Sequence, residues 1–405
     1  MKSYLGIDIA DTSIEIVELS KARSSFNMVS YARAELARDV IVQGRIKNRE
    51  GLNNIFQSLL DNASPQPAES RKAVVSFPDS LVYSLNYNIQ NDGQDLTGEK
   101  LEEVLRDQAR ATFLIEDENL HIVWLKNVLA DGSENYTIFG VDKQIVKNWQ
   151  LFFKEVGIEV LAIEPEVLGI MRGILADRDS EFQQSSMAVA DIGGTKTVLT
   201  FFYQGQPIIS ETILTGGFVW TTQLAQKIGG SFEAAEAQKI SFGLESPDMI
   251  NIVQPLAEKI TSSLQKYYSL YQHMPQELFL TGGSAQLPGL TEFLSNYLAQ
   301  RQTEGQIPEI SIPQGDQASM YVEAVGLAMY PTDAKYQKQS VDLRLSESEL
   351  KEKKIKTKER SGTKISVISS GVDKKTKKQL VMLVVIIVGG LSIAAIIWVI
   401  KNASN

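Results

Sequence analysis

One short motif occurs twice in this chain, and the repeat constrains the fold more than any other feature of the sequence. Residues 6–14 (GIDIADTSI) align with residues 189–197 (VADIGGTKT). Asp8 in the first copy matches Asp191 in the second. In each copy an apolar strand precedes a tight turn and another apolar strand follows it, which is the pattern of a β-hairpin. Such a duplicated unit predicts an α/β fold in two related halves, whose hairpins face each other across a cleft.

The turn of the second copy has the composition of a phosphate-binding tip. Gly193 and Gly194 have no Cβ, so backbone N–H groups there can approach an anion closely. Thr195 and Lys196 add a hydroxyl and a cation, and the carboxylate of Asp191 can hold the water shell of a metal ion. A Gly-Gly hairpin without a ligand is the commoner case. The presence of the motif in two copies favours a site in which both hairpin turns bind one polyphosphate.

A third segment, residues 278–290 (LFLTGGSAQLPGL), has the pattern of an apolar strand, a Gly-Gly-Ser turn and the start of a helix. Such a turn offers free backbone N–H groups to a ligand. Two D-I-x-x-T hairpins followed by an L-T-G-G-S turn resemble the actin-like ATPase superfamily, which includes actin, the 70-kDa heat-shock chaperones and the sugar kinases. The resemblance implies an α/β fold with duplicated ribonuclease-H-type domains around a nucleotide cleft.

The segment between the two hairpins narrows this resemblance. Its alternating apolar residues and its helix-period segments predict a compact βαββα module at about residues 79–156. This module, together with the segments AVVSFP and LEEVLRDQARATFLIEDENLHIVWL, resembles the PilM family of type IV pilus assembly proteins, which is related to the cell-division protein FtsA. We therefore expect a first actin-like domain over residues 1–185, which includes the module, and a second over residues 186–331.

The family resemblance implies which residues contact ATP and Mg²⁺. The contacts fall on both hairpin turns, on a Gly-Gly pair that opens the next helix, on an A-E-x-x-K segment at the ribose, and on the Gly-Gly-Ser turn at the adenosine. These residues are Asp8, Asp11, Thr12 and Ser13; Asp191, Gly193, Gly194, Thr195 and Lys196; Gly216 and Gly217; Glu236 and Lys239; and Gly282, Gly283 and Ser284. The metal ligands implied are Asp8 and Asp191. For Glu236 and Lys239, an ordinary i,i+3 surface pair is the alternative.

The first hairpin departs from the family pattern, D-I-G-x-x-S-V-K, at two positions. Ala10 replaces the glycine and resists a positive φ, so the backbone there approaches a phosphate less easily. Glu15 places a negative charge where the family has a cation. These changes predict nucleotide binding with at most slow ATP hydrolysis. Activation of a water molecule needs a positioned carboxylate. The candidates are Glu164, which we take as the catalytic residue, and Glu166, and a structural role is the commoner alternative for both.

Composition argues against several other classes of site and partner. The chain has no cysteine, which excludes a disulfide framework, a thiolate zinc site and a cysteine nucleophile. The two histidines, His121 and His273, are too isolated in sequence for a histidine metal site. The formal net charge is −9, and residues 332–379 hold twice as many Lys and Arg as Asp and Glu, so the preceding part is strongly acidic. An acidic body argues against nucleic acid as the main partner.

The C-terminal part changes in composition. Residues 332–379 are rich in Lys, Glu, Ser and Thr, and we interpret them as a flexible basic linker. Residues 380–400 carry no charge, and about 20 apolar residues cross a bilayer, so we expect a transmembrane helix there. Lysines at residues 374–378 precede it. The positive-inside rule then predicts a single-pass protein of the inner (cytoplasmic) membrane, with the globular part in the cytoplasm and the C-terminus outside.

With the family resemblance, these features imply a membrane-anchored adaptor or scaffold in type IV pilus or related secretion machinery. The partner implied is the short cytoplasmic peptide of a PilN-like membrane protein, beside other pilus-assembly proteins and further copies of this chain. Three alternatives remain open. They are a sugar kinase, because DIGGTK is also a kinase phosphate loop, an FtsA-like membrane tether, and a scaffold with an empty cleft.

The tail of the chain suggests a further hypothesis. Val341, Leu343 and Leu345 alternate as the residues of an edge-added strand do. We hypothesise that this segment docks in the groove that members of the family use for the partner's peptide, in cis or on a neighbouring copy. There it would compete with that peptide. A transient strand or a packing patch is the commoner alternative.

Overall fold

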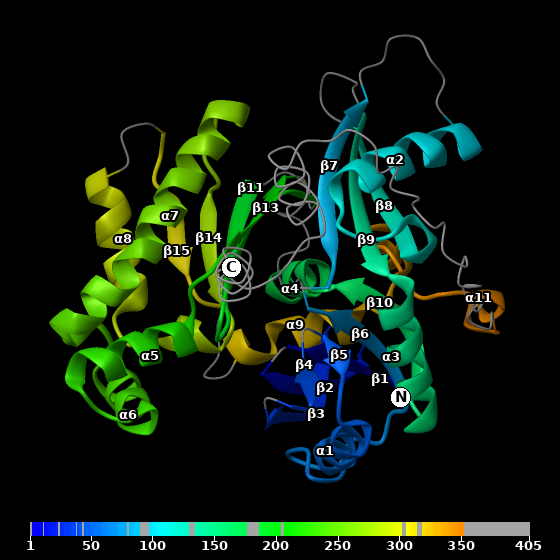
Figure 1. Ribbon diagram of the computed structural model, residues 1–405, viewed down its shortest axis with the longest axis horizontal. Coiled ribbons are helices and arrows are strands. Elements are labelled where there is room, and N and C mark those ends of the chain that lie inside the picture. Colours follow the sequence, from blue (N-terminus) through cyan, green and yellow to red (C-terminus); the bar gives the residue numbers. More distant parts are fainter. Residues whose placement is uncertain are drawn as a thin grey trace, which may run out of the picture. The chain divides into compact units, whose positions relative to one another are not determined.

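Two five-stranded sheets form the centre of the structure (Figure 1). The computed structural model describes residues 2–10, 12–22, 25–37, 39–42, 44–78, 81–89, 97–128, 134–175, 186–203, 206–301, 305–313 and 318–351. Of these, residues up to Leu350 form one unit. The strands of the two sheets are β1 (Ser3–Ile9), β2 (Ser13–Lys21), β3 (Phe26–Glu35), β6 (Lys72–Phe77) and β10 (Glu159–Pro165), and β11 (Ser186–Ile192), β12 (Thr197–Tyr203), β13 (Gln206–Ile213), β14 (Glu277–Thr281) and β15 (Glu309–Ser311).

The two sheets have the same topology. Their strand orders are β10-β6-β1-β2-β3 and β15-β14-β11-β12-β13. In each, the first three strands in sequence are antiparallel neighbours, and the last two run parallel to the first. The two copies of the motif join β1 to β2 and β11 to β12. The predicted α/β architecture with two related halves is therefore confirmed.

The helices cover the sheets and fill the space between them. They are α1 (Arg49–Asp61), α2 (Gly98–Thr112), α3 (Lys143–Glu155), α4 (Glu166–Ile174), α5 (Gly217–Ile228), α6 (Phe232–Phe242), α7 (Pro247–Tyr271), α8 (Leu290–Arg301), α9 (Ala318–Met329), α10 (Ala334–Lys338) and α11 (Glu347–Lys351). The described residues also include the short 3-10 turns η1 (Asp117–Asn119), η2 (Gly243–Glu245), η3 (Gly283–Gln286) and η4 (Tyr330–Thr332). A small hairpin is formed by β4 (Ile41–Val42) and β5 (Arg45–Ile46).

Apolar side chains on both faces hold the first sheet in place. Leu5 and Ile7 of β1 are fully buried in the largest core cluster. Val17 and Leu19 of β2 belong to a second cluster, which includes Ala324 and Met329 of α9. A strand covered on both faces needs apolar residues on both sides rather than strict alternation, and the sequence of β2 fits this requirement.

Helix α9 packs across the two halves, although it follows the second sheet in sequence. It contacts α4, β1 and β2 of the first half, and also β14 and η3 of the second (Figure 1). Glycines permit the close approach of α9 to β1 and α4. A Cβ on Gly6 would lie 1.8 Å from the carbonyl oxygen of Ala324, and a Cβ on Gly173 would lie 1.9 Å from that of Val322. We expected residues 186–331 to form the second domain, whereas this helix packs mainly on the first.

The inserted module has the expected β-α-β-β-α order. Its strands are β7 (Tyr83–Ile89), β8 (Leu120–Val128) and β9 (Glu134–Asp142), and they form an antiparallel sheet in the order β7-β9-β8. Leu105 and Ala109 of α2 are buried against this sheet. The last helix, α3, instead buries Trp149 and Phe153 in the core of the first half. The module is thus joined to the first half through that helix.

The chain stays folded beyond the end of the predicted second domain. Residues 332–351 include α10 and α11, and between these helices Val341, Leu343 and Leu345 are buried in the core of the first half. This differs from the flexible linker that we expected over residues 332–379. The average composition of this stretch predicted a linker, because composition does not show that three of its apolar residues have a surface against which they can be buried.

The remaining C-terminal predictions concern residues that the structure does not describe. Residues 352–379 of the linker and residues 380–400, expected to span a membrane, lie outside the described residues. Among the residues that are described, no helix has the length and apolar character needed to cross a bilayer.

Candidate functional site

A cavity of about 940 Å³ lies where the two halves meet. Both hairpin turns reach it, as do the start of α5, the middle of α6 and the turn after β14. Every described residue implied by the family resemblance as a nucleotide contact lines this cavity, except Gly216. Asp11 lies outside the described residues. The structure thus brings five separate segments of the sequence to one place.

The turn of the second hairpin is fixed against the elements that follow it. The N–H of Gly217, at the start of α5, donates to the carbonyl oxygen of Gly193 at 3.0 Å. The hydroxyl of Ser284 donates to the same carbonyl at 3.1 Å. Gly216 lies behind this contact, because a Cβ there would come within 2.4 Å of the same oxygen. The hairpin turn, the helix start and the Gly-Gly-Ser turn therefore form one continuous wall.

The turn after β14 holds Asp191 at the inner end of that wall. Gly282 has a φ of +82°, which favours glycine, and a Cβ there would lie 2.6 Å from Oδ1 of Asp191. Thr281 donates its hydroxyl to the same oxygen at 3.1 Å. Burial raises the pKa of the Asp191 carboxyl, and the hydrogen bond from Thr281 and the charge of Lys196 partly offset this rise. The side chain is held in place, and its charge is incompletely solvated.

Lys239 is a buried cation beneath the start of α5. Only 7 % of the residue is exposed. Its Nζ donates to Oε2 of Glu236 at 2.8 Å, to the hydroxyl of Thr221 at 2.9 Å and to the carbonyl oxygen of Gly217 at 3.2 Å. This burial excludes the ordinary surface pair that we considered for Glu236 and Lys239. The positive end of the α5 dipole adds to the field at this wall.

Three buried carboxylates meet on the opposite wall, which belongs to the first half. Asp8 from β1, Glu166 from α4 and Glu323 from α9 have carboxylate oxygens within 4.8 Å of one another. Oδ1 of Asp8 and Oε1 of Glu323 accept no hydrogen bond from the described residues. Carboxylate oxygens in such a group are the ligands that Mg²⁺ takes in proteins.

Burial and mutual repulsion raise the pKa values of two members of this carboxylate cluster, Asp8 and Glu323. Burial, and then the charges of Glu15 and Asp191, raise the pKa of Asp8 well above its ordinary value. Burial, and then Asp8 and Glu166, raise the pKa of Glu323 in the same way. A divalent cation would relieve both effects, since it compensates the charge and occupies the unsatisfied oxygens. The residues present therefore fit a bound divalent cation.

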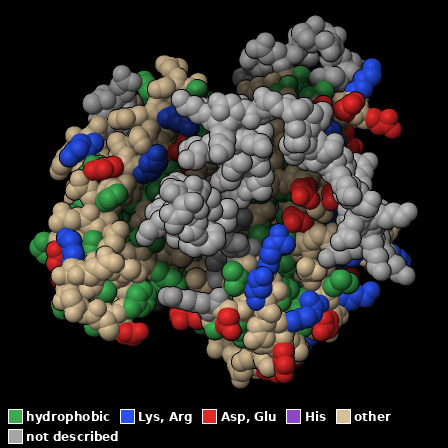
Figure 2. Space-filling view, viewed as in Figure 1, with side chains coloured by type: hydrophobic (Ala, Val, Ile, Leu, Met, Phe, Trp, Pro, Cys, Tyr) green, Lys and Arg blue, Asp and Glu red, His purple; other side chains and the backbone are tan. Residues whose placement is uncertain are grey.

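The interior of the cleft differs from the outer surface in how its charges are arranged. On the outer face seen in Figure 2, Lys and Arg side chains are interspersed with Asp and Glu. In the cleft, the carboxylate cluster lies on the first-half wall, and Lys196 and Lys239 lie on the second-half wall. A ligand that carries negative charge together with a cation would match both walls.

Glu323 and Arg33 are charged residues of the cavity that carry no motif and were not predicted as site residues. Glu323 lies within the apolar helix ASMYVEAVGLAM, and a single acid in such a helix was the signal available. Arg33 on β3 donates its Nε to Oε1 of Glu15 at 2.7 Å. Glu15 therefore lines the cavity with its carboxylate paired to the guanidinium of Arg33. Burial raises the pKa of Glu15, and Arg33 acts against this rise.

The structure does not bring Glu164, the catalytic candidate, to the cavity. Its side chain is fully buried, and Arg172 of α4 donates to both carboxylate oxygens, at 2.8 and 3.0 Å. Ser340 donates its hydroxyl to the same carboxylate. Glu166, two residues further on, lines the cavity. Of the two candidates, Glu166 is the one that can reach a ligand in the cleft.

Comparison with known proteins gives a family match and several distant relatives. A family model described as type IV pilus assembly protein PilM matches residues 6–331. The cell division protein FtsA of Enterococcus hirae is 22% identical over 336 residues, which cover 71% of this chain and 75% of that protein. FtsA of Rhizobium meliloti (strain 1021) is 25% identical over 232 residues, which cover 48% of this chain and 52% of that protein.

Solved structures are similar at the level of the fold. The structure titled PilM-PilN type IV pilus biogenesis complex aligns with a TM-score of 0.67 and 18% identity, over 82% of this chain and 98% of the other. The ethanolamine utilization protein EutJ from Carboxydothermus hydrogenoformans aligns with a TM-score of 0.50 and 17% identity, over 82% and 90% of the two chains.

Proposed function

Because the chain belongs to the PilM family of type IV pilus assembly proteins, whose model matches residues 6–331, we propose that its cleft binds ATP with Mg²⁺ and that it is a nucleotide-sensitive adaptor in pilus assembly. One observation carries this proposal. Both hairpin turns meet in a single cavity that has lysines on one wall and a carboxylate cluster on the other. A polyphosphate with its metal ion carries the two complementary charges.

The residues of the two walls would have different tasks. Lys196 and the glycine-rich turn of the second hairpin would bind the phosphates, Glu236 and Lys239 would reach the ribose, and the Gly-Gly-Ser turn would lie against the adenosine. The carboxylate cluster, with Asp191, would hold Mg²⁺ directly or through water. When bound, Mg²⁺ neutralises phosphate charge. Glu166 is the carboxylate that would orient a water molecule, and Ala10 and Glu15 in the first hairpin favour at most slow hydrolysis.

A titration of the full chain with a fluorescent ATP analogue, with and without Mg²⁺, tests this function. We expect saturable binding that Mg²⁺ strengthens, and we expect Asp191→Ala to lose most of the gain from Mg²⁺. Equal affinities of parent and variant, or no binding at all, would contradict the proposal. Added sugars should leave ATP turnover unchanged, and a large increase would favour a sugar kinase instead.

We further propose that the protein acts at the inner membrane. In this proposal residues 380–400 cross the bilayer once, with the folded part in the cytoplasm and the C-terminus outside. The PilM-PilN complex among the similar structures supports a PilN-like peptide as one partner. Other pilus-assembly proteins and further copies of this chain complete the set of partners proposed.

A further inference from the structure

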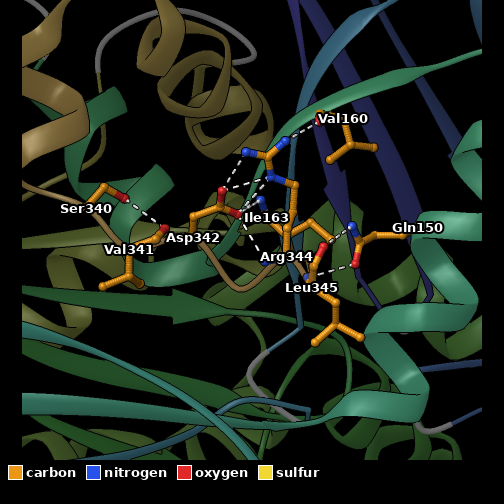
Figure 3. A network of polar contacts seen from close by, with 8 residues as sticks. All are labelled: Gln150, Val160, Ile163, Ser340, Val341, Asp342, Arg344 and Leu345. Carbon is orange, nitrogen blue, oxygen red and sulfur yellow. Dashed lines mark hydrogen bonds and ion pairs between the residues drawn. The ribbon is translucent and has the colours of Figure 1, made fainter. Parts of the chain in front are cut away.

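The tail segment, which we define as residues 340–350, lies against β10 and α3 of the first half (Figure 3). Residues 340–346 form no helix or strand. The surface beneath them, which we call the β10–α3 groove, presents Gln150 of α3 and Val160 and Ile163 of β10 to the segment. The contact has the features of a bound peptide rather than of a continuing domain.

Side chains of the tail segment alternate between buried and exposed. Val341, Leu343 and Leu345 are 7 %, 0 % and 5 % exposed and belong to the largest core cluster. Asp342 and Arg344 lie between them, with about a third of each side chain exposed. An extended peptide that docks on a surface shows this period of two, because successive side chains point to opposite sides.

Polar groups of the tail segment satisfy the open edge of β10. This strand is the last in its sheet, so one side of it has no neighbouring strand to pair with. The N–H of Leu343 donates to the carbonyl oxygen of Ile163 at 2.8 Å, and the N–H of Ile163 donates to Oδ1 of Asp342 at 3.1 Å. Arg344 donates to the carbonyl oxygen of Val160 at 2.8 Å. Only the first of these bonds joins backbone to backbone.

Gln150 binds the backbone of the tail segment on the other side of the groove. Its Nε2 donates to the carbonyl oxygen of Leu345 at 3.2 Å, and its Oε1 accepts from the N–H of the same residue at 2.9 Å. Figure 3 shows both bonds. A side-chain amide that pairs with both backbone groups of one residue recognises an extended chain whatever side chain that residue carries.

The groove lies within the part of the chain that the family model matches, and its occupant lies outside that part. Gln150, Val160 and Ile163 fall within residues 6–331, which the family model matches, and the tail segment falls outside them. We propose that the tail segment is a tethered ligand of the β10–α3 groove, docked in cis, and this proposal rests on the peptide partner proposed above. The groove then accepts an extended peptide with alternating apolar residues from another chain only when the tail segment has left. This inference does not depend on nucleotide binding.

Tethering explains how a segment with one main-chain bond stays docked. A short tether raises the effective concentration of a ligand to about the millimolar range, so that a modest intrinsic affinity suffices to keep the site filled. A free competitor must overcome this advantage. The same tether keeps the segment close to the groove after it has left, so that it can dock again.

The first experiment measures binding of a fluorescent peptide of residues 338–350 (KQSVDLRLSESEL) to the full chain. The Leu343→Ser, Leu345→Ser double variant frees the groove, so it should bind the peptide at least ~10-fold more tightly than the parent chain. A peptide with the same two serines should not bind. Adding Gln150→Ala to the double variant should weaken binding, whereas Gln254→Ala, on the side of α7, should not. Equal binding by parent and double variant would overturn the proposal.

A second experiment keeps every native side chain, in case the double variant unfolds. A protease site inserted after Lys338 allows the tail segment to be cut from the folded full chain. The cut segment should stay bound, and an excess of the native peptide should displace it, whereas the serine peptide should not. A cut segment that no concentration of peptide displaces would show a fixed part of the core and overturn the proposal. Recovery of the segment of one copy in the groove of another would overturn docking in cis.

Discussion

Lys239 shows how one buried residue fixes a wall of the cleft. Its ammonium has three hydrogen-bond partners, one of which is the carboxylate of Glu236, and it lies under the first turn of a helix. Desolvation of such a group is costly unless its charge is matched, and Glu236 supplies the matching charge. The three bonds use all three N–H donors of the ammonium, so Lys239 shapes the second-half wall by linking the start of α5 to α6.

We expect Lys239→Met to weaken binding of the ATP analogue by about tenfold or more, because it removes the bonds that hold the start of α5 to Glu236 at the cavity wall, and hydrogen bonds to charged groups contribute roughly 1.5–3 kcal/mol. The matched control is Lys227→Met on α5, where the ammonium pairs with Asp248 at 3.1 Å and both side chains are about half exposed. That change should leave binding nearly unaltered, since exposed pairs contribute little. Equal losses for both variants would count against a specific role of Lys239.

The carboxylate cluster predicts a dependence of stability on pH. The pKa values of Asp8 and Glu323 are raised in the folded protein, so the folded state holds protons that the unfolded state releases. Without Mg²⁺, the free energy of unfolding should therefore fall as pH rises above about 4, the ordinary pKa of carboxyl groups, and should level off above the raised values. Each unit of pKa shift corresponds to about 1.4 kcal/mol.

The Glu323→Gln variant tests this dependence through urea denaturation at pH 5 and pH 8. Removal of one acid should raise the urea midpoint at pH 8 and reduce the difference between the two pH values. Mg²⁺ should have a similar effect on the parent chain and a smaller one on the variant. A parent chain that is more stable at pH 8 than at pH 5 without metal would contradict the assignment.

The position of a residue in the site could be predicted where the residue belongs to a local sequence motif. Asp191, Gly193 and Lys196 follow one another in a hairpin turn, and the structure places them where the motif predicted. Arg33 and Glu323 reach the cavity from β3 and α9, and tertiary packing alone brings them there. Glu164 lies away from the cavity for a related reason, because its orientation depends on Arg172.

At the scale of elements, the packing of α9 on the first half relies on positions without a Cβ. Gly173 on α4 faces the carbonyl oxygen of Val322, and Gly326 on α9 faces that of Gly169. A Cβ added to either glycine would lie 1.9 Å from the facing oxygen. Backbone surfaces at this distance cannot adjust as side chains do. The contact therefore fixes the position of the helix that carries Glu323 to the cleft.

We expect Gly173→Ala to destabilise the folded chain by about 2 kcal/mol or more, because overpacking forces the two helices apart. The control is Gly283→Ala, where an added Cβ meets no atom within 4 Å and the backbone is not in the left-handed region. The control should lose less than about 0.5 kcal/mol, as is usual for a change without steric conflict. Urea denaturation measures both variants, and similar losses would contradict the close packing.

Elements with regular periodicity were predictable, and those that depend on a distant surface were not. The module from β7 to α3 follows the alternation and helix period of its own sequence. The tail segment lies in a stretch rich in Lys, Glu and Ser, and its apolar residues acquire a role only because the edge of β10 is available. The packing of α9 against the first half was missed for the same reason, because the sequence of that helix does not indicate which elements it packs against.

At the scale of the whole molecule, we expect the full chain to remain with membranes after an alkaline carbonate wash. Residues 380–400 contain no charged side chain, and apolar residues such as Leu, Ile and Val each favour insertion by roughly 0.3 to 0.6 kcal/mol. A chain that ends at residue 350, where the folded unit ends, is the control and should be released. Release of the full chain by carbonate would contradict the proposed span.

The return of α9 to the first half has a consequence for synthesis on the ribosome. The first half contains strands from the beginning of the chain, but Val322 of α9 belongs to its core. Nascent domains usually mature from the N-terminus onward. In this chain the second sheet is complete once β15 has emerged, whereas the first must wait for residues translated after it. The half that begins the polypeptide is therefore the last to mature.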